Sequence, residues 1–272
     1  MRHSLRVYLV VTACALATAA FSQDWAKEKV DASPRHLEWI DLKNGDLTVK
    51  ALIAYPEVSE KATVVIVIHE NRGLNDWAML VADQLAEAGY IAIAPDFLTG
   101  LGPDGGKTSD FVDSSKIRDA IYSLTDDQVI GGLDAAFEYG KKLAAGNGKV
   151  VVAGFCWGGS RTFQYATRQK GLSAAFVFYG TGPDNADAIK ATKGINCPVY
   201  GFYGGRDNRV NASIPNSEEL MKAAGKMYEP VIYEGAGHGF MRAGQQPGAQ
   251  AANATARASG WKRWMDILSK IK

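Results

Sequence analysis

A cysteine, an aspartate and a histidine that could together perform nucleophilic catalysis occur along this 272-residue chain, and the cysteine has the most specific setting. Cys156 lies in Gly-Phe-Cys-Trp-Gly-Gly, directly after an apolar run. This pattern is typical of a nucleophile elbow, a tight strand-to-helix turn that exposes a reactive side chain. The partial positive charge of a helix N-terminus favours the thiolate, which is the attacking form.

The glycines around Cys156 allow two other interpretations. A phosphate-binding loop would need a Lys-Ser or Lys-Thr pair after the last glycine, and Ser160-Arg161 follows instead. A small buried cysteine beside a packing glycine is the purely structural alternative. We favour the elbow.

A thiol in this role needs a base and an orienting carboxylate. The chain has four histidines, and His238 lies in Gly-Ala-Gly-His-Gly-Phe, a glycine-rich loop after the apolar run 231–233. By contrast, His36 precedes the predicted core and His69 ends an apolar run. Asp207, in Gly-Gly-Arg-Asp, follows another predicted strand. The order Cys156, Asp207, His238 is the nucleophile, acid, histidine order of α/β-hydrolases.

Apolar, β-branched runs predict the strands that would position these residues. The runs are 48–54, 63–68, 90–94, 150–154, 174–178, 199–203 and 230–233. Helical patterns separate most of them, so we expect an α/β fold with a mainly parallel, doubly wound sheet and helices on both faces. The carboxyl ends of parallel strands share one edge, where chemistry gathers.

Several segments between and after the strands have a predicted structure of their own. Asn75 is expected to cap a helix that runs to about Ala88 and ends at Gly89 in the left-handed region, and a second apolar stripe over 261–271 predicts a C-terminal helix. The segment 98–115 is a long, Gly- and Pro-containing connection, which often covers a site. We expect it to line the pocket and 243–258 to form a loop.

From about residue 41 to the C-terminus, the chain resembles the dienelactone hydrolase family. The resemblance rests on His-Glu-Asn-Arg-Gly-Leu at 69–74, Ala-Pro-Asp at 94–96, the cysteine motif, Gly-Gly-Arg-Asp at 204–207 and Gly-His-Gly-Phe at 237–240. It implies that a Cys-His-Asp triad opens an activated lactone. It also implies that Glu70 helps to deprotonate Cys156 when substrate enters. An ion pair with Arg72 is a compatible structural interpretation of Glu70.

The same resemblance implies an oxyanion hole and a site for a substrate carboxylate. The backbone N–H groups of Asn71 and Trp157 match the oxyanion hole, and Arg242 matches one of two carboxylate-binding arginines. The second would fall at Gly100 and is missing, which raises the question of another lactone or a short ester as substrate. Arg72 is the candidate to compensate.

The charge composition argues against a nucleic-acid-binding protein, and the N-terminal residues predict export from the cytoplasm. The net charge of +1 lacks the basic excess of a nucleic-acid binder. Residues 1–22 have basic residues, then an apolar stretch, and no acidic residue, as in a cleaved signal peptide, so we expect a secreted or periplasmic protein without stable membrane insertion. We do not expect lipid attachment at Cys14. Residues 23–272 are expected to form a single domain, and the protein to be a monomer.

Two cysteines, Cys156 and Cys197, remain after such cleavage. They are predicted to lie at opposite edges of the sheet, about 17 Å apart at ~3.3 Å per residue, whereas a disulfide needs Cα atoms within ~7 Å. We therefore expect two free thiols. No metal site and no cofactor are expected, because the histidines are few and scattered and no dinucleotide loop follows the first strand.

The predicted function is hydrolysis of a small activated lactone or ester. A general carboxylesterase or thioesterase that uses the same three residues is the alternative within enzymes. A binding protein that keeps the pocket without turnover is the alternative from another class.

Overall fold

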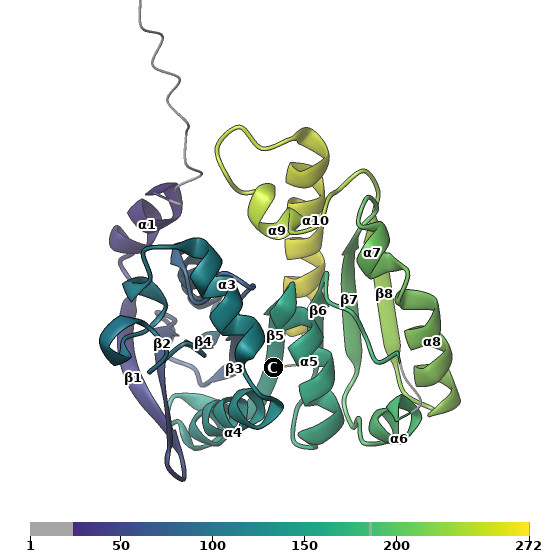
Figure 1. The fold of residues 1–272 in the computed structure, drawn as a ribbon, viewed down its shortest axis with the longest axis horizontal. Helices are drawn as coiled ribbons and strands as arrows, with labels where there is room; N and C mark the ends of the chain where they lie inside the picture. The colour runs from purple at the N-terminus through teal and green to yellow at the C-terminus, as the bar shows by residue number, and fades with distance from the viewer. Residues whose placement is uncertain (1–23, 185–186, 272) are drawn as a thin grey trace, which may run out of the picture.

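A computed structural model describes residues 24–184 and 187–271 of the chain. In this part, eight strands form one sheet in the order β1-β2-β4-β3-β5-β6-β7-β8 (Figure 1). They are β1 (His36–Asn44), β2 (Leu47–Tyr55), β3 (Ala62–Ile68), β4 (Ile91–Pro95), β5 (Gly146–Phe155), β6 (Ala175–Phe178), β7 (Val199–Gly204) and β8 (Tyr228–Tyr233). The six neighbouring strands β4, β3, β5, β6, β7 and β8 are mutually parallel. At one end of the sheet, β2 pairs antiparallel with both β4 and β1, so β2 runs opposite to the other seven strands. The predicted signal peptide and Cys14 lie outside the described residues.

All seven predicted strands are present, with ends that differ by a few residues, and the mainly parallel sheet is confirmed. Strand β1 was missed. Its sequence, His-Leu-Glu-Trp-Ile-Asp-Leu-Lys-Asn, contains charged residues, and of its nine residues Leu42 alone is buried. An edge strand pairs on one side and faces solvent, so it has no continuous apolar run.

Helices cover both faces of the sheet. On one face lie α3 (Ser114–Ser123), α4 (Asp126–Lys142), α5 (Trp157–Arg168) and α8 (Ile214–Ala223). On the other lie α1 (Asp24–Asp31), α2 (Asp76–Glu87), α9 (Phe240–Ala243) and α10 (Ala251–Leu268). Shorter helices α6 (Ala188–Lys193) and α7 (Asn208–Asn211) flank β7 in the chain.

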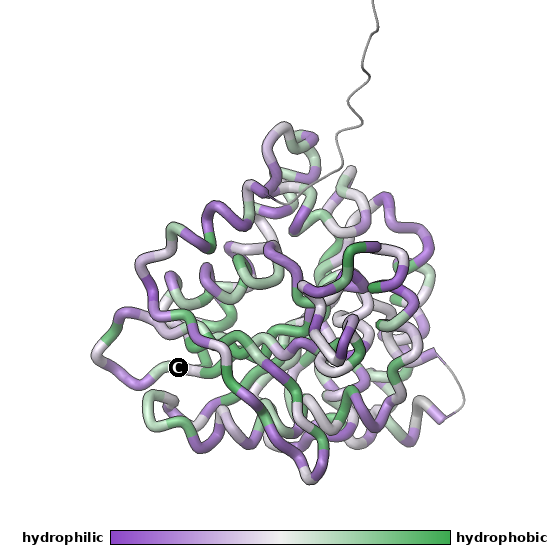
Figure 2. The backbone as a smooth tube through the Cα atoms, turned by 60° about the vertical axis from the view of Figure 1, so that its left-hand side comes forward, coloured by the Kyte–Doolittle hydropathy of each residue, from purple (hydrophilic) through white to green (hydrophobic). Residues whose placement is uncertain are grey.

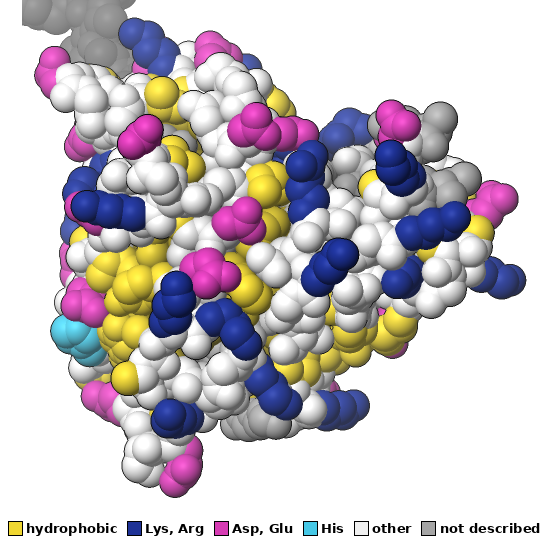
Figure 3. All heavy atoms as spheres, turned by 90° about the horizontal axis from the view of Figure 1, so that it is seen from below, with side chains coloured by type: hydrophobic (Ala, Val, Ile, Leu, Met, Phe, Trp, Pro, Cys, Tyr) yellow, Lys and Arg dark blue, Asp and Glu magenta, His cyan; other side chains and the backbone are white. Residues whose placement is uncertain are grey.

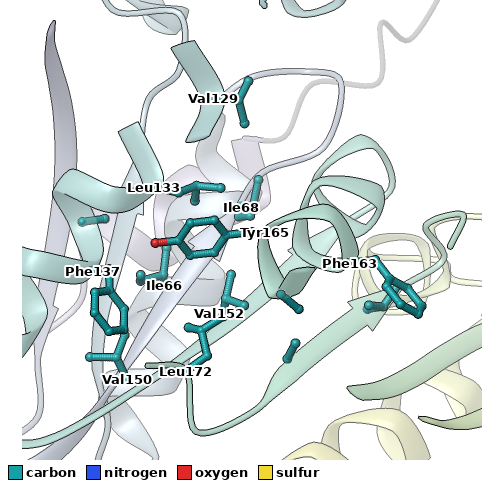
Figure 4. Packing of buried hydrophobic residues seen from close by; sticks show 14 of the residues in the cluster. Ile66, Ile68, Val129, Leu133, Phe137, Val150, Val152, Phe163, Tyr165 and Leu172 are labelled. Carbon is teal, nitrogen blue, oxygen red and sulfur yellow. The ribbon is translucent and has the colours of Figure 1, made fainter. Parts of the chain in front are cut away.

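The central strands are apolar on both faces because both faces are covered. In β3, alternate residues enter different cores: Ile66 and Ile68 pack toward α4 and α5, whereas Val65 and Val67 pack toward α2 and α10. Figure 4 shows Ile66, Ile68 and Val152 facing the side chains of α4 and α5. The tube in Figure 2 is correspondingly green along the central strands and largely purple at the periphery. This covered sheet is the rigid base that the site needs.

The predicted helix after β3 is confirmed as α2. The Asn75 side chain accepts a hydrogen bond from the Ala78 N–H, and Gly89 ends the helix region with φ +91°. The prediction for 243–258 is wrong in its second half, because α10 begins at Ala251. Alanine has the highest helix propensity, and a tertiary contact such as buried Ala256 completes the helix where no apolar stripe marked it.

The connection 98–115 is ordered by hydrogen bonds to a buried aspartate. It contains two single 3₁₀ turns, Pro103–Gly105 and Thr108–Asp110. The Asp96 carboxylate accepts hydrogen bonds from the Thr108 N–H at 3.0 Å and the Thr108 hydroxyl at 2.6 Å, as well as from the Leu98 N–H at 3.1 Å. The expectation that this connection lines the pocket is wrong. Tyr122 of α3, the helix that follows, lines it instead.

Candidate active site

The candidate residues all follow strands at one edge of the sheet. Glu70 comes two residues after β3, Cys156 directly after β5, Asp207 three residues after β7 and His238 five residues after β8. Because these strands are parallel, their carboxyl ends meet at the same edge. Figure 1 shows β3, β5, β6, β7 and β8 in succession across the sheet.

Cys156 occupies a strained turn between β5 and α5. Its backbone has φ +57° and ψ −114°, a conformation that few residues other than glycine adopt. The free-energy cost of such backbone strain is characteristic of functional sites. The Cys156 N–H donates to the Phe178 carbonyl at 3.0 Å, which ties the turn to β6. The turn requires glycines around it: a Cβ on Gly154 would overlap the Gly158 carbonyl oxygen, and one on Gly159 would lie 2.6 Å from the Phe178 carbonyl oxygen.

The structure brings Cys156, His238 and Asp207 together. Nε2 of His238 lies 3.1 Å from Sγ of Cys156, and Nδ1 lies 2.5 Å from Oδ2 of Asp207. Burial opposes protonation of the imidazole, but its hydrogen bonds to Asp207 and Cys156 outweigh burial and raise the pKa of His238 to about 9. Burial likewise opposes ionisation of Asp207, and its hydrogen bond to His238 outweighs this and lowers the pKa of the carboxyl. The arrangement therefore favours an imidazolium beside the sulfur.

Glu70 is buried and bound to two residues other than Cys156. Its Oε2 accepts a hydrogen bond from Nε of Arg242 at 2.8 Å, and its Oε1 accepts one from the Tyr179 hydroxyl at 3.2 Å. The interpretation of Glu70 as an ion pair with Arg72 is therefore wrong in its partner. Arg72 is exposed, whereas the short helix α9, which begins two residues after His238, brings Arg242 to Glu70.

Tyr179 is a site residue that the sequence analysis missed. It directly follows β6, is fully buried with φ +41°, and packs its ring edge-on against His238 with centroids 5.2 Å apart. Burial and the neighbouring Glu70 raise its pKa, so the phenol stays protonated and donates. Its position at the end of a predicted strand, on the same edge as Cys156, was the signal that could have found it.

The two predicted oxyanion-hole residues follow two neighbouring parallel strands, β3 and β5. Trp157 is the first residue of α5, and Asn71 follows Glu70 after β3. Within the described residues, neither backbone N–H has a hydrogen-bond acceptor. The backbone of α5 packs directly on the end of β3, because Gly158 lies against the carbonyl oxygens of Ile68 and His69. Two donors without acceptors thus lie at the ends of adjacent strands, and one of them belongs to the residue after Cys156.

A cavity of about 600 Å³ opens beside Cys156 and extends along α5 toward α6 and α7. Its lining includes apolar residues such as Phe163 and Val210 and the cations Arg161 and Arg209. Arg161 is paired with Asp126 at 2.6 Å, whereas Arg209 is exposed and has no ion pair among the described residues. Neither Arg242 nor Arg72 belongs to this lining. Neither cavity arginine was predicted from the sequence as a site residue, because no motif gives Arg209 or Arg161 a role in binding.

The described residues also provide information on the cysteines, on metal binding, on membrane-spanning helices and on surface charge. Cys197 is buried and both cysteines are free. No cluster of His, Cys, Asp and Glu there could hold a metal ion, and none of its helices is long and apolar enough to cross a membrane. Figure 3 shows a face on which basic, acidic and apolar side chains are interspersed, in keeping with the near-equal charge counts.

A mainly parallel sheet covered by helices, with a cysteine elbow and a histidine at its carboxyl edge, defines an α/β-hydrolase. The model of the dienelactone hydrolase family matches residues 49–272. The chain therefore belongs to the dienelactone hydrolase family.

Relatives and solved structures agree with this family. A Salmonella typhimurium protein assigned as a carboxymethylenebutenolidase is 31% identical over 229 residues, which cover 81% of this chain and 82% of the relative. A Saccharolobus solfataricus protein with the same assignment is 29% identical over 262 residues, covering 82% and 94% of the two chains. The structure of a Klebsiella pneumoniae protein assigned as a dienelactone hydrolase superposes with a TM-score of 0.73 at 24% identity, covering 86% of this chain and 98% of that one. This last likeness shows the fold.

Proposed function

We propose that this protein is an exported hydrolase that opens an activated lactone or cleaves a small ester with Cys156 as nucleophile. The observation that carries the proposal is the chain of contacts from Sγ of Cys156 through the His238 imidazole to the Asp207 carboxylate, at 3.1 and 2.5 Å. A nucleophile within hydrogen-bond reach of a base, itself oriented by a third group, is the arrangement that acyl transfer requires.

In the first half of the proposed reaction, the Cys156 thiolate attacks the carbonyl carbon and the carbonyl oxygen becomes an oxyanion. The N–H groups of Asn71 and Trp157 donate to this oxygen, and such donors without competing acceptors stabilise charge as it develops. The tetrahedral intermediate then collapses to a thioester and expels the alcohol or enol. The imidazolium of His238 gives its proton to that leaving group.

In the second half, neutral His238 takes a proton from water, and the resulting hydroxide attacks the thioester. Formation of the thioester removes the negative sulfur that stabilises the imidazolium, so acylation lowers the pKa of His238 and makes it available as a base. Asp207 keeps the imidazole oriented throughout. The products are the carboxylate, one proton released to solvent, and the regenerated Cys156 thiolate beside the His238 imidazolium.

The ion pair between Glu70 and Arg242 would allow an anionic substrate to promote formation of the Cys156 thiolate. In the free protein the two are paired, and Glu70 has no hydrogen bond to Cys156. A substrate carboxylate that binds Arg242 would compete with Glu70 for the guanidinium. In protein molecules in which Cys156 is still a thiol, the released Glu70 carboxylate accepts its proton and so adds to the thiolate that His238 forms. Arg72 is exposed and makes no ion pair with the described residues, and it stays the candidate for a second cation toward the substrate carboxylate.

The test is the initial rate of dienelactone hydrolysis by the reduced protein and by Cys156→Ala. We expect a loss of at least about 10³-fold, in line with the removal of other nucleophiles. Cys197→Ala is the matched control, because this second thiol is buried away from the cavity. A Cys156→Ala rate equal to that of the wild type would disprove the proposal. Ligand-induced stabilisation without turnover of any lactone or ester would favour the non-catalytic binding protein.

The size of the cavity favours a second candidate, a carboxylesterase with larger substrates. A volume of about 600 Å³ falls in the range that accommodates drug-sized ligands and exceeds what one small ring fills. Comparing dienelactone with p-nitrophenyl esters of increasing acyl length separates the two. An increase of kcat/KM with chain length supports the esterase, and a preference for the lactone supports the first proposal.

Export is the part of the proposal that rests on sequence alone. The basic start and apolar stretch of residues 1–22, without acidic residues, support a cleaved signal peptide. Mass spectrometry of the native protein should find an N-terminus near residue 21–23. Retention of residues 1–20 would contradict export by this route.

A further inference from the structure

A second histidine, His69, lies beside the proposed site without contacting the cavity. It follows β3 directly, is fully buried, and is absent from the cavity lining. Its Nδ1 lies 2.8 Å from the carbonyl oxygen of Glu70. A carbonyl oxygen can only accept, so Nδ1 carries the proton and Nε2 does not. Burial lowers the pKa of His69, which keeps the ring neutral.

The carbonyl that His69 binds belongs to the same peptide group as the Asn71 N–H. A trans peptide is planar, and its C=O and N–H point in opposite directions. Fixing the Glu70 carbonyl therefore fixes the direction of the Asn71 N–H. The Gly73 N–H also donates to this carbonyl, at 3.2 Å, so the peptide is held by two donors on one side while its own N–H has no acceptor among the described residues.

The ring of His69 also contacts the residue that carries the other proposed donor. It stacks on the Trp157 indole with centroids 5.5 Å apart and an interplanar angle of 15°. Phe97 closes the stack edge-on, 5.4 Å from His69 and 5.8 Å from Trp157. One imidazole thus binds the peptide group that carries the Asn71 N–H and stacks on the side chain of Trp157, whose backbone N–H is the other proposed donor.

We propose that His69 is a positioning residue that sets the oxyanion hole. Its Nδ1–H holds the Glu70–Asn71 peptide so that the Asn71 N–H faces the reacting carbonyl oxygen, and its ring holds Trp157 at the start of α5. This inference rests on the proposed acyl-transfer function. His69 does not exchange a proton with substrate, because its one N–H is committed to Glu70 and its ring lies outside the cavity.

Substitution of His69 by asparagine or by glutamine separates the effect of its hydrogen bond to the Glu70 carbonyl from the effect of its packing. The amide nitrogen of asparagine can take the place of Nδ1, whereas that of glutamine extends one bond further, toward the place of Nε2. We expect His69→Gln to lower kcat for ester hydrolysis about 10- to 100-fold, less than the loss of an entire oxyanion donor, with KM changed less than about threefold. His69→Asn should retain more activity than His69→Gln, and the pH profile should keep its shape in both.

Alkylation of Cys156 by iodoacetamide provides the second measurement, because this reaction forms no oxyanion. Both variants should alkylate within about threefold of the wild-type rate. The exposed His36→Gln is the matched control and should change neither rate. Wild-type kcat in His69→Gln, equal losses in both variants, or parallel losses of hydrolysis and alkylation would overturn the inference. If Cys156→Ala hydrolyses as fast as the wild type, the proposed function itself fails, which is a distinguishable result.

Discussion

Nε of Arg242 lies 2.8 Å from Oε2 of Glu70, and this contact joins two residues to which the sequence assigns different tasks. Glu70 was expected to activate Cys156, and Arg242 to bind a substrate carboxylate. In the free protein the two side chains form an ion pair with each other, and their exposed fractions are 4% for Glu70 and 21% for Arg242. In the proposed mechanism, this ion pair couples activation of the thiol to recognition of an anion.

The first prediction concerns the strength of this coupling. Arg242→Ala leaves a buried carboxylate without its cation, which costs about 3–5 kcal/mol in comparable buried pairs. Glu70→Gln removes the charge, so the double variant should be less destabilised than the sum of the single variants. We expect an interaction free energy of about 1–3 kcal/mol from urea unfolding of all four proteins.

The exposed pair Lys262–Asp266 is the matched control for this cycle, with side-chain exposures of 76% and 55%. Its interaction free energy should not exceed about 0.5 kcal/mol. Additive effects of Arg242→Ala and Glu70→Gln would mean that the contact carries no coupling in solution.

Most of the sheet and three site residues could be predicted because local patterns determine them. The continuous apolar runs identify buried strands, and the glycines around Cys156 and His238 mark the turns at their ends. What could not be predicted depends on contacts between distant segments. The partner of Glu70 lies 172 residues away, and α9 brings Arg242 there rather than the neighbouring Arg72. The start of α10 and the edge strand β1 likewise depend on packing that no periodicity reveals.

The second prediction concerns Tyr179, which holds the other oxygen of Glu70. Tyr179→Phe keeps the ring against His238 but removes the hydrogen bond at 3.2 Å. Leaving a buried acceptor with one partner fewer costs about 1–3 kcal/mol, which is a decrease in Tm of roughly 2–10 °C for a protein of this size. Tyr122→Phe is the control, since this exposed hydroxyl accepts one long hydrogen bond of 3.4 Å, and its Tm should stay within about 2 °C. An unchanged Tm in Tyr179→Phe would show that water replaces the hydroxyl.

The third prediction concerns the close approach of α5 to β3. A Cβ on Gly158 would overlap the carbonyl oxygens of Ile68 and His69, and rigid backbone cannot move aside as a side chain can. Gly158→Ala should therefore destabilise the fold by more than about 2 kcal/mol and slow Cys156 alkylation. Gly131→Ala in α4 is the control, because its Cβ would meet a Leu47 methyl at 3.1 Å that can shift, and alanine favours the helix. Equal stability of the two variants would contradict the packing argument.

The fourth prediction concerns stability as a function of pH. Folding raises the pKa of His238 from 6.5 to about 9, so the folded protein binds the proton more tightly than the unfolded chain. The stabilisation from this group is fully present below pH 6.5 and is lost as the pH rises through about 9. The difference in unfolding free energy between wild type and His238→Gln should therefore shrink from pH 6 to pH 9.5. A difference that grows over this range would contradict an imidazolium beside Cys156.

The last prediction uses the same pKa to separate the acid role of His238 from its base role. An alkyl ester expels a poor leaving group that needs the proton of the imidazolium, whereas p-nitrophenolate leaves without it. Above a pH of about 9, where His238 loses this proton, kcat/KM should fall for the alkyl ester and fall less for the p-nitrophenyl ester with the same acyl group. Because kcat/KM reports the free enzyme up to acylation, deacylation does not obscure the comparison. Parallel profiles for the two esters would show that water, rather than His238, protonates the leaving group.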